Sequence, residues 1–194
     1  MSAARTSALK KPATYADLER VPGHLVAEIL NGELHTTPRP RARHAMAASE
    51  IGSDLGPPFG RGRGGPGGWW LLVEPELHLQ SDVLVPDLAG WRRDRMPSVP
   101  DEAALTLRPD WVCEVLSPST ESRDRAIKLP IYAREGVPFA WLVNPASETL
   151  EVMRLEGGRW VLLGTFAGDA VVHAEPFDAI AIEIFHWWGR DAPL

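Results

Sequence analysis

The feature that most constrains the fold is a short run, Trp111 to Leu116, in which one carboxylate stands among apolar side chains. A strand with one face in water alternates apolar and polar residues, so a continuous apolar run indicates burial on both faces. The chain must therefore form a sheet that is covered on both sides. Because an ionised carboxylate in such a strand costs several kcal/mol unless a partner compensates it, we expect Glu114 to be a site residue.

The length of 194 residues leaves room for one sizeable core, and we expect a single domain over residues 12–194 after a flexible leader over residues 1–11. A composition of 44% hydrophobic and 24% charged residues is typical of globular proteins. No apolar stretch approaches the roughly 20 residues that a membrane-spanning helix needs. The single cysteine, Cys113, excludes a disulfide within the chain and a cysteine-based metal cluster. We therefore expect a cytoplasmic protein with no membrane partner.

The net charge of −6 argues against a general nucleic-acid-binding protein, but the charge is unevenly distributed. Residues 148–194 hold eight acidic residues against three arginines, or −5, so the remaining residues are almost neutral. Within them, arginines cluster in sequence that is typical of loops. These clusters fit either solvated surface charge or phosphate contacts. We carry forward four arginines as nucleic-acid-binding candidates: Arg41, Arg43, Arg61 and Arg63.

Periodicity and turn residues predict a succession of strands with interleaved helices. Asn31-Gly32, between two strand-like runs, predicts an N-terminal β-hairpin. Helical spacing predicts a helix over residues 41–55 and another over residues 120–135, in which Pro130 either introduces a kink or begins the second half. The sequence GPPFGRGRGGPGG, residues 56–68, predicts a flexible loop without a regular element. The remaining strand candidates are WWLLV, ELHLQ, VLVPDLAGW, FAWLVN, TLEVMRLE, RWVLLGTF and AIAIEIF. The predicted class is α/β (α+β), with a mixed central sheet flanked by helices.

A second carboxylate, Asp87, lies in the apolar run VLVPDLAGW, and Lys128 follows on the predicted helix. If the two strands are neighbours, Asp87 and Glu114 converge on one point. Two carboxylates that close repel each other unless a cation lies between them. Because oxygen ligands suit hard ions, the pattern predicts Mg²⁺ or Mn²⁺ as the cofactor.

The sequence resembles the Uma2 family (DUF820) of restriction endonucleases, which belongs to the wider PD-(D/E)xK nuclease superfamily. The resemblance covers about residues 12–155 and rests on a series of motifs in the family's order. They are AEILNGEL, a following histidine, VPDL, EVLSPST, RDRAIKLPIYAREGV and AWLVNP. It implies a restriction-endonuclease-like core and a metal-dependent DNA endonuclease, with DNA as substrate and a homodimer as one possible assembly.

The resemblance also implies roles for individual residues. Asp87 and Glu114 correspond to the metal-binding acids, and the motif places a lysine two positions after the glutamate. Here Leu116 stands at that position, so we expect Lys128 to supply the catalytic ammonium. Glu28 resembles a third metal ligand.

Two further points remain open at this stage. His44 resembles the histidine that begins the first long helix in the family, where we give it a supporting role. Glu28 on a hairpin and His44 on a helix each also fit an ordinary surface position.

Two other functions remain open. Leu116 at the usual lysine position and the acidic net charge also fit a catalytically inactive nuclease-fold module that binds nucleic acid or a protein partner. A glycosidase that uses the two carboxylates as acid and base explains neither the lysine nor the basic segments, and is the weaker alternative.

Overall fold

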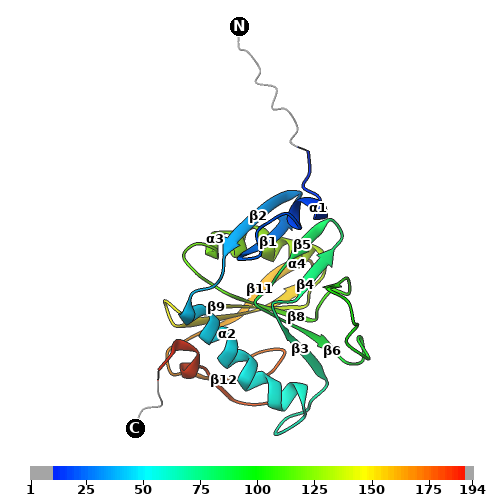
Figure 1. Cartoon of the computed structure of the whole chain (residues 1–194). Helices are drawn as coiled ribbons and strands as arrows, with labels where there is room; N and C mark the ends of the chain where they lie inside the picture. Colours follow the sequence, from blue (N-terminus) through cyan, green and yellow to red (C-terminus); the bar gives the residue numbers. More distant parts are fainter. Residues whose placement is uncertain (1–10, 191–194) are drawn as a thin grey trace.

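The main sheet of the computed structural model, which describes residues 11–190, has six strands and passes through the middle of the molecule (Figure 1). In sheet order the strands are β11 (Arg159–Ala167), β10 (Thr149–Glu156), β9 (Phe139–Asn144), β8 (Trp111–Val115), β6 (Leu88–Arg92) and β3 (Trp69–Val73). Neighbouring strands are antiparallel except β8 and β9, which are parallel. The sheet is therefore mixed, as predicted.

A second sheet of five strands carries the N-terminal hairpin. Its order is β2 (Glu33–Pro38), β1 (Leu25–Leu30), β5 (Asp82–Leu84), β4 (Glu76–Leu79) and β7 (Ala104–Leu105). Asn31 and Gly32 join β1 to β2 with φ values of 51° and 78°, the left-handed conformation that this turn requires. A short helix, α1 (Tyr15–Leu18), begins with a capping box between Thr14 and Asp17. The predicted hairpin is confirmed, although it belongs to a separate sheet.

The segment that we predicted as one strand, VLVPDLAGW, is divided between the two sheets. β5 ends at Leu84, and β6 begins at Leu88 in the other sheet. Pro86 lies between them and cannot donate a ladder hydrogen bond, which explains why the strand is interrupted there. Asp87 is therefore not inside a strand, as the sequence suggested, but in the connection where the chain passes from one sheet to the other.

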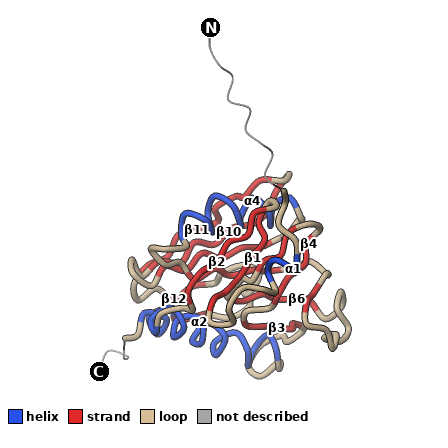
Figure 2. Tube along the Cα trace, turned by 45° about the horizontal axis from the view of Figure 1, so that its top comes forward, coloured by secondary structure: helices blue, strands red, loops and turns tan. Residues whose placement is uncertain are grey.

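Helices cover the two faces of the main sheet. Figure 2 shows α2 (Ala42–Leu55) along one side of the strands and α4 (Leu129–Arg134) on the opposite side. The predicted helix over residues 120–135 consists of α3 (Glu121–Arg123), a π-helical turn η2 (Asp124–Lys128) and α4. Pro130 lies in the first turn of α4, where a missing N–H is tolerated.

Two sequence predictions are wrong. Residues 56–60 form a π-helical turn, η1 (Gly56–Gly60), which continues α2, because Pro57 and Pro58 occupy first-turn positions that need no N–H donor. The predicted strand AIAIEIF is reduced to β13 (Ile182–Glu183), paired with β12 (Val171–Val172), and a 3₁₀ helix, η3 (Ile184–Trp188), follows it. In both segments apolar residues pack into the core. Apolar content alone therefore did not distinguish a loop from a helical turn at residues 56–60, or a strand from a 3₁₀ helix near Ile184.

Each face of the main sheet has its own hydrophobic core. Trp111, Cys113 and Val115 of β8 pack with α2 and η3, whereas Val112 and Leu116 pack with α4. Burial of β8 on both faces is thus confirmed. Within residues 11–190 no helix is both long enough and apolar enough to span a membrane. The predicted leader lies almost entirely outside the described residues.

Candidate active site

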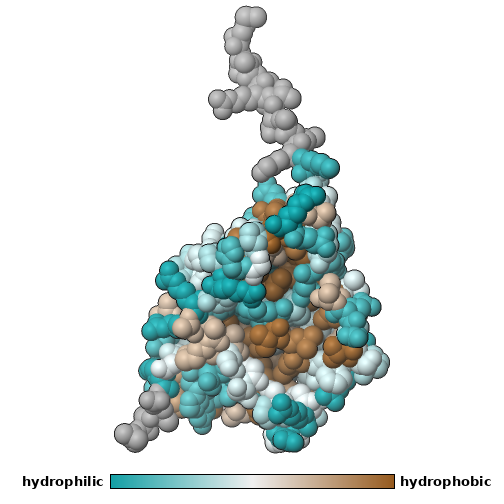
Figure 3. All heavy atoms as spheres, in the orientation of Figure 1, coloured by the Kyte–Doolittle hydropathy of each residue, from teal (hydrophilic) through white to brown (hydrophobic). Residues whose placement is uncertain are grey.

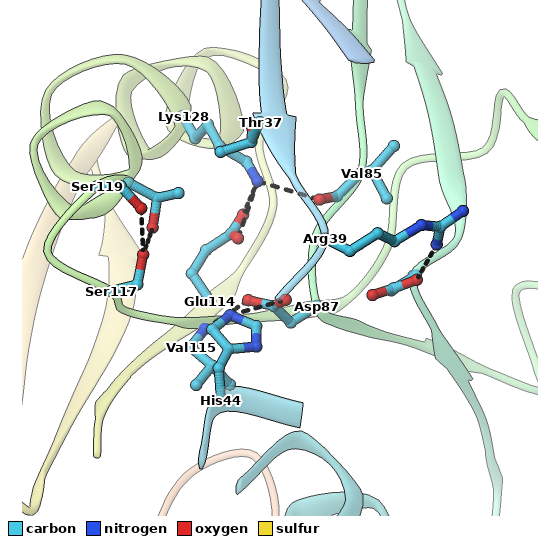
Figure 4. Close-up of polar contacts among 12 residues, drawn as sticks. Thr37, Arg39, His44, Val85, Asp87, Glu114, Val115, Ser117, Ser119 and Lys128 are labelled. Carbon is cyan, nitrogen blue, oxygen red and sulfur yellow. Dashed lines mark hydrogen bonds and ion pairs between the residues drawn. The ribbon is translucent and has the colours of Figure 1, made fainter. Parts of the chain in front are cut away.

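A pocket of about 370 Å³ lies where the two sheets, the start of α2 and the π-helical turn meet. Six predicted site residues line it: Glu28, Arg41, His44, Asp87, Glu114 and Lys128. Figure 4 shows the Lys128 ammonium directed at Glu114, and His44 beside Asp87. The fold therefore brings together residues that are up to 100 positions apart in the chain, from Glu28 to Lys128.

Glu114 is 2% exposed and belongs to the face of β8 that carries Val112 and Leu116. Its carboxylate accepts a hydrogen bond from the Lys128 ammonium at 2.8 Å and another from the Tyr132 hydroxyl at 2.6 Å. Both donors come from the helical segment that covers this face. The buried carboxylate thus has the compensating partners that its position demands.

Lys128 is 3% exposed, and its ammonium has three acceptors. These are Glu114 at 2.8 Å, the Glu28 carboxylate at 3.1 Å and the Val85 carbonyl at 3.1 Å. An ammonium has three N–H donors, so every donor has an acceptor in this arrangement. Lys128 is consequently held in one position, and it can contact a substrate only if one of these acceptors is released.

Glu28, on β1, does not face solvent, because it is only 2% exposed. One carboxylate oxygen accepts the Val85 N–H at 3.0 Å and lies 3.1 Å from Lys128. The other lies 3.8 Å from the Arg123 guanidinium. Glu28 therefore anchors Lys128 and the β5–β6 connection together.

Asp87 is fixed from two sides. Its Oδ2 accepts the Val115 N–H at 2.7 Å, which couples the connection before β6 to the end of β8. Its Oδ1 lies 3.3 Å from His44 Nε2, and His44 Nδ1 is buried without a hydrogen-bond partner. Burial lowers the pKa of His44, but the hydrogen bond and charge of Asp87 outweigh it, and the net pKa is raised.

The pocket holds an excess of negative charge. Burial raises the pKa of Glu114 well above its usual range; Lys128 opposes the shift, and Asp124 adds to it. Burial lowers the pKa of Lys128, but the carboxylates of Glu114 and Glu28 outweigh burial and raise it. When these groups are ionised and His44 is neutral, the pocket lining carries five carboxylates and four cations, a net charge of −1. They are Glu28, Glu74, Asp87, Glu114 and Asp124 against Arg39, Arg41, Arg123 and Lys128.

The π-helical turn explains how Lys128 comes to lie beside Glu114. Leu116 lies on the same face of β8 as Glu114, but it packs into the core beneath α4. Lys128 closes the π-helical turn η2 directly above that face, and its ammonium occupies the position beside Glu114. π-Helical turns of this kind occur frequently at functional sites. The expectation that Lys128 reaches the pocket is confirmed as a placement.

The donors suit a hard divalent cation in their chemistry. The Asp87 and Glu114 carboxylates offer oxygen donors, which hard divalent cations such as Mg²⁺ and Mn²⁺ prefer. Within residues 11–190, however, no three His, Cys, Asp or Glu side chains converge as a ready-made metal site. The Lys128 ammonium already lies between Glu28 and Glu114. An ion at Asp87 and Glu114 therefore has to displace a contact that Glu114 makes to Lys128 or to Tyr132.

The four predicted nucleic-acid-binding arginines are placed differently. Arg41 lines the pocket at the start of α2, and Arg43 is exposed two residues further on. Arg61 and Arg63 follow η1, beyond the opposite end of α2, and do not line the pocket.

Asp124 and Tyr132, which contact the pocket or Glu114, are among the residues that the sequence did not identify. Asp124 lines the pocket, and Tyr132 binds Glu114 from the adjoining core. Both lie four positions from Lys128, one on each side, which is the spacing that places side chains on one helix face. That spacing was the available signal.

The comparisons with known proteins agree with this architecture. The family model Uma2, described as "Putative restriction endonuclease", matches residues 12–184. A solved structure described as a "putative nuclease belonging to DUF820", from Anabaena variabilis, superposes with a TM-score of 0.69 at 21% identity, over 92% of this chain and 98% of that chain. No curated protein matches the chain. At this identity the structural match supports the fold, a restriction-endonuclease-like one, and the family match spans most of the chain. The chain therefore belongs to the Uma2 family.

Proposed function

We propose that the protein is a metal-dependent DNA endonuclease that hydrolyses phosphodiester bonds in this pocket. The observation that carries the proposal is the convergence of Asp87, Glu114 and Lys128 on one cavity, with the lysine ammonium 2.8 Å from Glu114. Two acids and a lysine at one point are what phosphodiester hydrolysis with a hard metal ion requires.

Asp87 and Glu114 would hold Mg²⁺ or Mn²⁺, which when bound lowers the pKa of a water molecule and stabilises charge on the phosphoryl oxygens. His44 and the Val115 N–H keep the Asp87 carboxylate oriented toward the pocket. Glu28 stays the proposed third ligand through its Oε2, which lies 3.8 Å from Arg123, while its Oε1 binds Lys128 and the Val85 N–H.

Lys128 would donate a hydrogen bond to the phosphoryl oxygen that gains charge in the transition state. Its three donors are all engaged, so contact with the substrate requires the release of one acceptor. Glu28 and Val85 keep the ammonium in place when the contact to Glu114 is given up. Arg41, at the pocket rim, and Arg43 would bind the phosphates that flank the scissile one.

The second candidate is a nuclease-fold module that binds nucleic acid or a partner protein without cutting it. The observation in its favour is that Lys128 is fully engaged by buried acceptors, as a purely structural ion pair would be. Such a module has no need for a metal ion at Asp87 and Glu114.

Cleavage assays with Mn²⁺ and Mg²⁺ on single-stranded, duplex and branched DNA test the first proposal. Glu114→Gln is nearly isosteric, and we expect it to abolish cleavage. Lys128→Met should keep metal binding and lose about 10²- to 10³-fold in rate, as for removal of one donor to a developing oxyanion.

Glu151→Gln is the matched control, because Glu151 is also a strand carboxylate paired with a cation, Arg125, but lies outside the pocket. It should cut at the wild-type rate. Cleavage by Glu114→Gln equal to that of the wild type would show that the activity belongs to another site or to a contaminant.

Melting curves distinguish the two candidates. An ion that binds the folded protein and not the unfolded chain raises the melting temperature by mass action. We expect millimolar Mn²⁺ to stabilise the wild type and Glu151→Gln but not Glu114→Gln. A wild-type melting temperature that does not respond to either ion, together with no cleavage, supports the non-catalytic module.

Two further predictions from the sequence belong with this proposal. A homodimer is supported by the edge strand β11, where Val161, Leu162 and Leu163 are all exposed, with Leu162 at 55%. A cytoplasmic location is supported by the single cysteine, Cys113, which is buried. Size-exclusion chromatography of the wild type and Leu162→Lys would test the first.

A further inference from the structure

A second hollow, of about 650 Å³, lies beside the middle and the C-terminal end of α2, against β3 and η1. Its floor is apolar and comes from Trp70, Leu71, Val73 and Leu88. Val73 is 64% exposed, more than any other large hydrophobic residue in the part of the chain that the structure describes. Figure 3 shows apolar residues gathered in this hollowed face. We call this hollow the β3 groove.

The β3 groove continues from the active-site pocket. Asp87 and Glu74 line the pocket, and their chain neighbours Leu88 and Val73 line the groove. Along α2, His44 lines the pocket and Ala48, one turn later, lines the groove. A ligand that passes through the pocket and along α2 therefore reaches the groove without leaving the surface.

Arginines without carboxylate partners stand at the far end of the groove. Arg93 lies with its guanidinium 3.9 Å from the Trp70 ring centroid and donates to the Gly60 carbonyl at 2.6 Å and the Trp69 carbonyl at 3.3 Å. Arg61 also lines the groove and is exposed. Within residues 11–190, neither forms an ion pair with an acid, and both charges remain available to an anion.

Other exposed arginines of the described residues also form no ion pair, so the lack of a partner alone does not mark the β3 groove. What marks it is the combination of two such arginines with a lining that contains no acid among the described residues. The positive charge at the β3 groove therefore complements a polyanion, and the apolar floor complements a flat ring.

We infer that the β3 groove binds unpaired nucleotides of the strand that is cut, with bases against the Leu71–Val73 floor and phosphates on Arg61 and Arg93. The inference rests on the proposed function for the position of the scissile phosphate. Base contact with an apolar surface and phosphate contact with arginines are how proteins hold single strands. Paired bases are stacked inside a duplex and cannot reach the floor.

The length of α2 sets the reach of the strand. Its 14 residues rise about 1.5 Å each, or about 21 Å in total. At about 3.4 Å per nucleotide, the spacing in a stacked strand, the length of α2 corresponds to roughly six nucleotides, and an unstacked strand needs fewer. A strand of six residues therefore has few nucleotides left to contact the pocket and Arg61 together, whereas one of fourteen covers both places.

Fluorescence anisotropy with labelled oligothymidylates of six and fourteen nucleotides tests the inference on the full-length chain in EDTA, where no cleavage interferes. Arg61→Gln should weaken binding of the longer strand about fivefold and reduce the slope of log K against log salt by about 0.7, the value for one phosphate contact to a single strand. Val73→Asp should weaken it as well. The loss of affinity in both variants should be smaller for the six-residue strand. A blunt duplex should bind to the wild type more weakly than the single strand does.

Arg159→Gln is the matched control, because Arg159 is also exposed, lies on the distant edge strand β11 and has no ion pair among the described residues. It should bind the longer strand as the wild type does. The inference is overturned if Arg61→Gln binds the longer strand with wild-type affinity, or if Arg159→Gln lowers that affinity as much as Arg61→Gln does. It is also overturned if the wild type binds the duplex as tightly as the single strand and Arg61→Gln weakens both equally. The cleavage assay with Glu114→Gln tests the proposed function, and the anisotropy assay in EDTA tests the β3 groove. Failure of one proposal can therefore be distinguished from failure of the other.

Discussion

The two faces of β8 are equally buried and chemically opposite. On one face Trp111 packs edge-on against Trp141 and Phe177, with ring centroids 5.2 Å and 4.9 Å apart. On the other face Glu114 is bound by Lys128 and Tyr132. The aromatic face gains its stability chiefly from apolar burial. The charged face has to balance desolvation against ion pairing, which stability by itself does not require. This difference is the reason that we propose the function on the second face.

The largest expected change in stability is on the aromatic face. Trp111→Ala removes a fully buried indole that contacts two other rings, and we expect a loss of about 3–5 kcal/mol in the free energy of unfolding. Urea unfolding followed by circular dichroism measures it. Because this face carries no ion, the loss should be the same with and without Mn²⁺. A loss below about 1 kcal/mol would mean that the aromatic face is not tightly packed.

On the charged face, the free energy of unfolding should depend on ion pairing and not on side-chain size. Lys128→Met keeps the length of the side chain but leaves Glu28 and Glu114 buried without their cation, at a cost of about 3 kcal/mol. Adding Glu114→Gln should recover part of this loss, because one uncompensated charge is removed. Additive losses in the double-mutant cycle would contradict the assigned pairing.

Tyr132→Phe tests a single hydrogen bond on the same face. The ring and its packing remain, but Glu114 loses the 2.6 Å contact from the hydroxyl. We expect a loss of about 1–2 kcal/mol, typical of a hydrogen bond to a charged group. Stabilisation by Mn²⁺ should persist, because Tyr132 is not a proposed ligand. A variant that no longer responds to Mn²⁺ would assign Tyr132 a direct role in ion binding.

The smallest effect concerns Asp54, a carboxylate at the rim of the aromatic core. Trp187 donates to Asp54 at 2.7 Å. Burial raises the pKa of Asp54; the Trp187 hydrogen bond and His186 oppose the shift, and Glu50 and Glu183 add to it. At pH values between the pKa of Asp54 in the unfolded chain and its higher pKa in the folded protein, the folded protein binds more protons than the unfolded chain. The contribution of Asp54 to the free energy of unfolding therefore falls as pH rises through this range.

Asp54→Asn removes that titration and keeps an acceptor for Trp187. Unfolding free energies of both proteins between about pH 4 and pH 6 give the difference, in which the other acids cancel. The wild type should lose stability relative to the variant as pH rises through this window. A difference that grows in the opposite direction would show that Asp54 is stabilised in its charged form.

Most elements followed from local pattern, and the exceptions have identifiable causes. The Asn31-Gly32 hairpin and the buried β8 strand were predicted because turn chemistry and apolar continuity are local properties. The sheet to which each strand belongs was not predicted. One apolar run around Pro86 became β5 and β6 in different sheets, and apolar residues near the C-terminus became a 3₁₀ helix.

The sequence predicted which residues belong to the candidate site, but not the contacts that they make with one another. Asp87, Glu114 and Lys128 were named from residue type and family pattern, and the pocket contains all three. That Glu28 faces Lys128, and that Tyr132 binds Glu114, depends on contacts between β1, β8 and α4. Their metal-binding and catalytic roles stay predictions.

The sequence by itself determined that a carboxylate had to be buried in a strand covered on both faces, because alternation is absent around Glu114. The family resemblance placed Lys128 at the site, but only the tertiary structure decided that its ammonium compensates Glu114 and that Glu28 and Tyr132 complete the contacts. Leu116 is two residues from Glu114, yet Lys128 provides the charge from the helical segment packed above the same face. The reason is physical: strand periodicity is fixed by neighbouring residues, whereas the partner of a buried charge is fixed by whichever element packs over it.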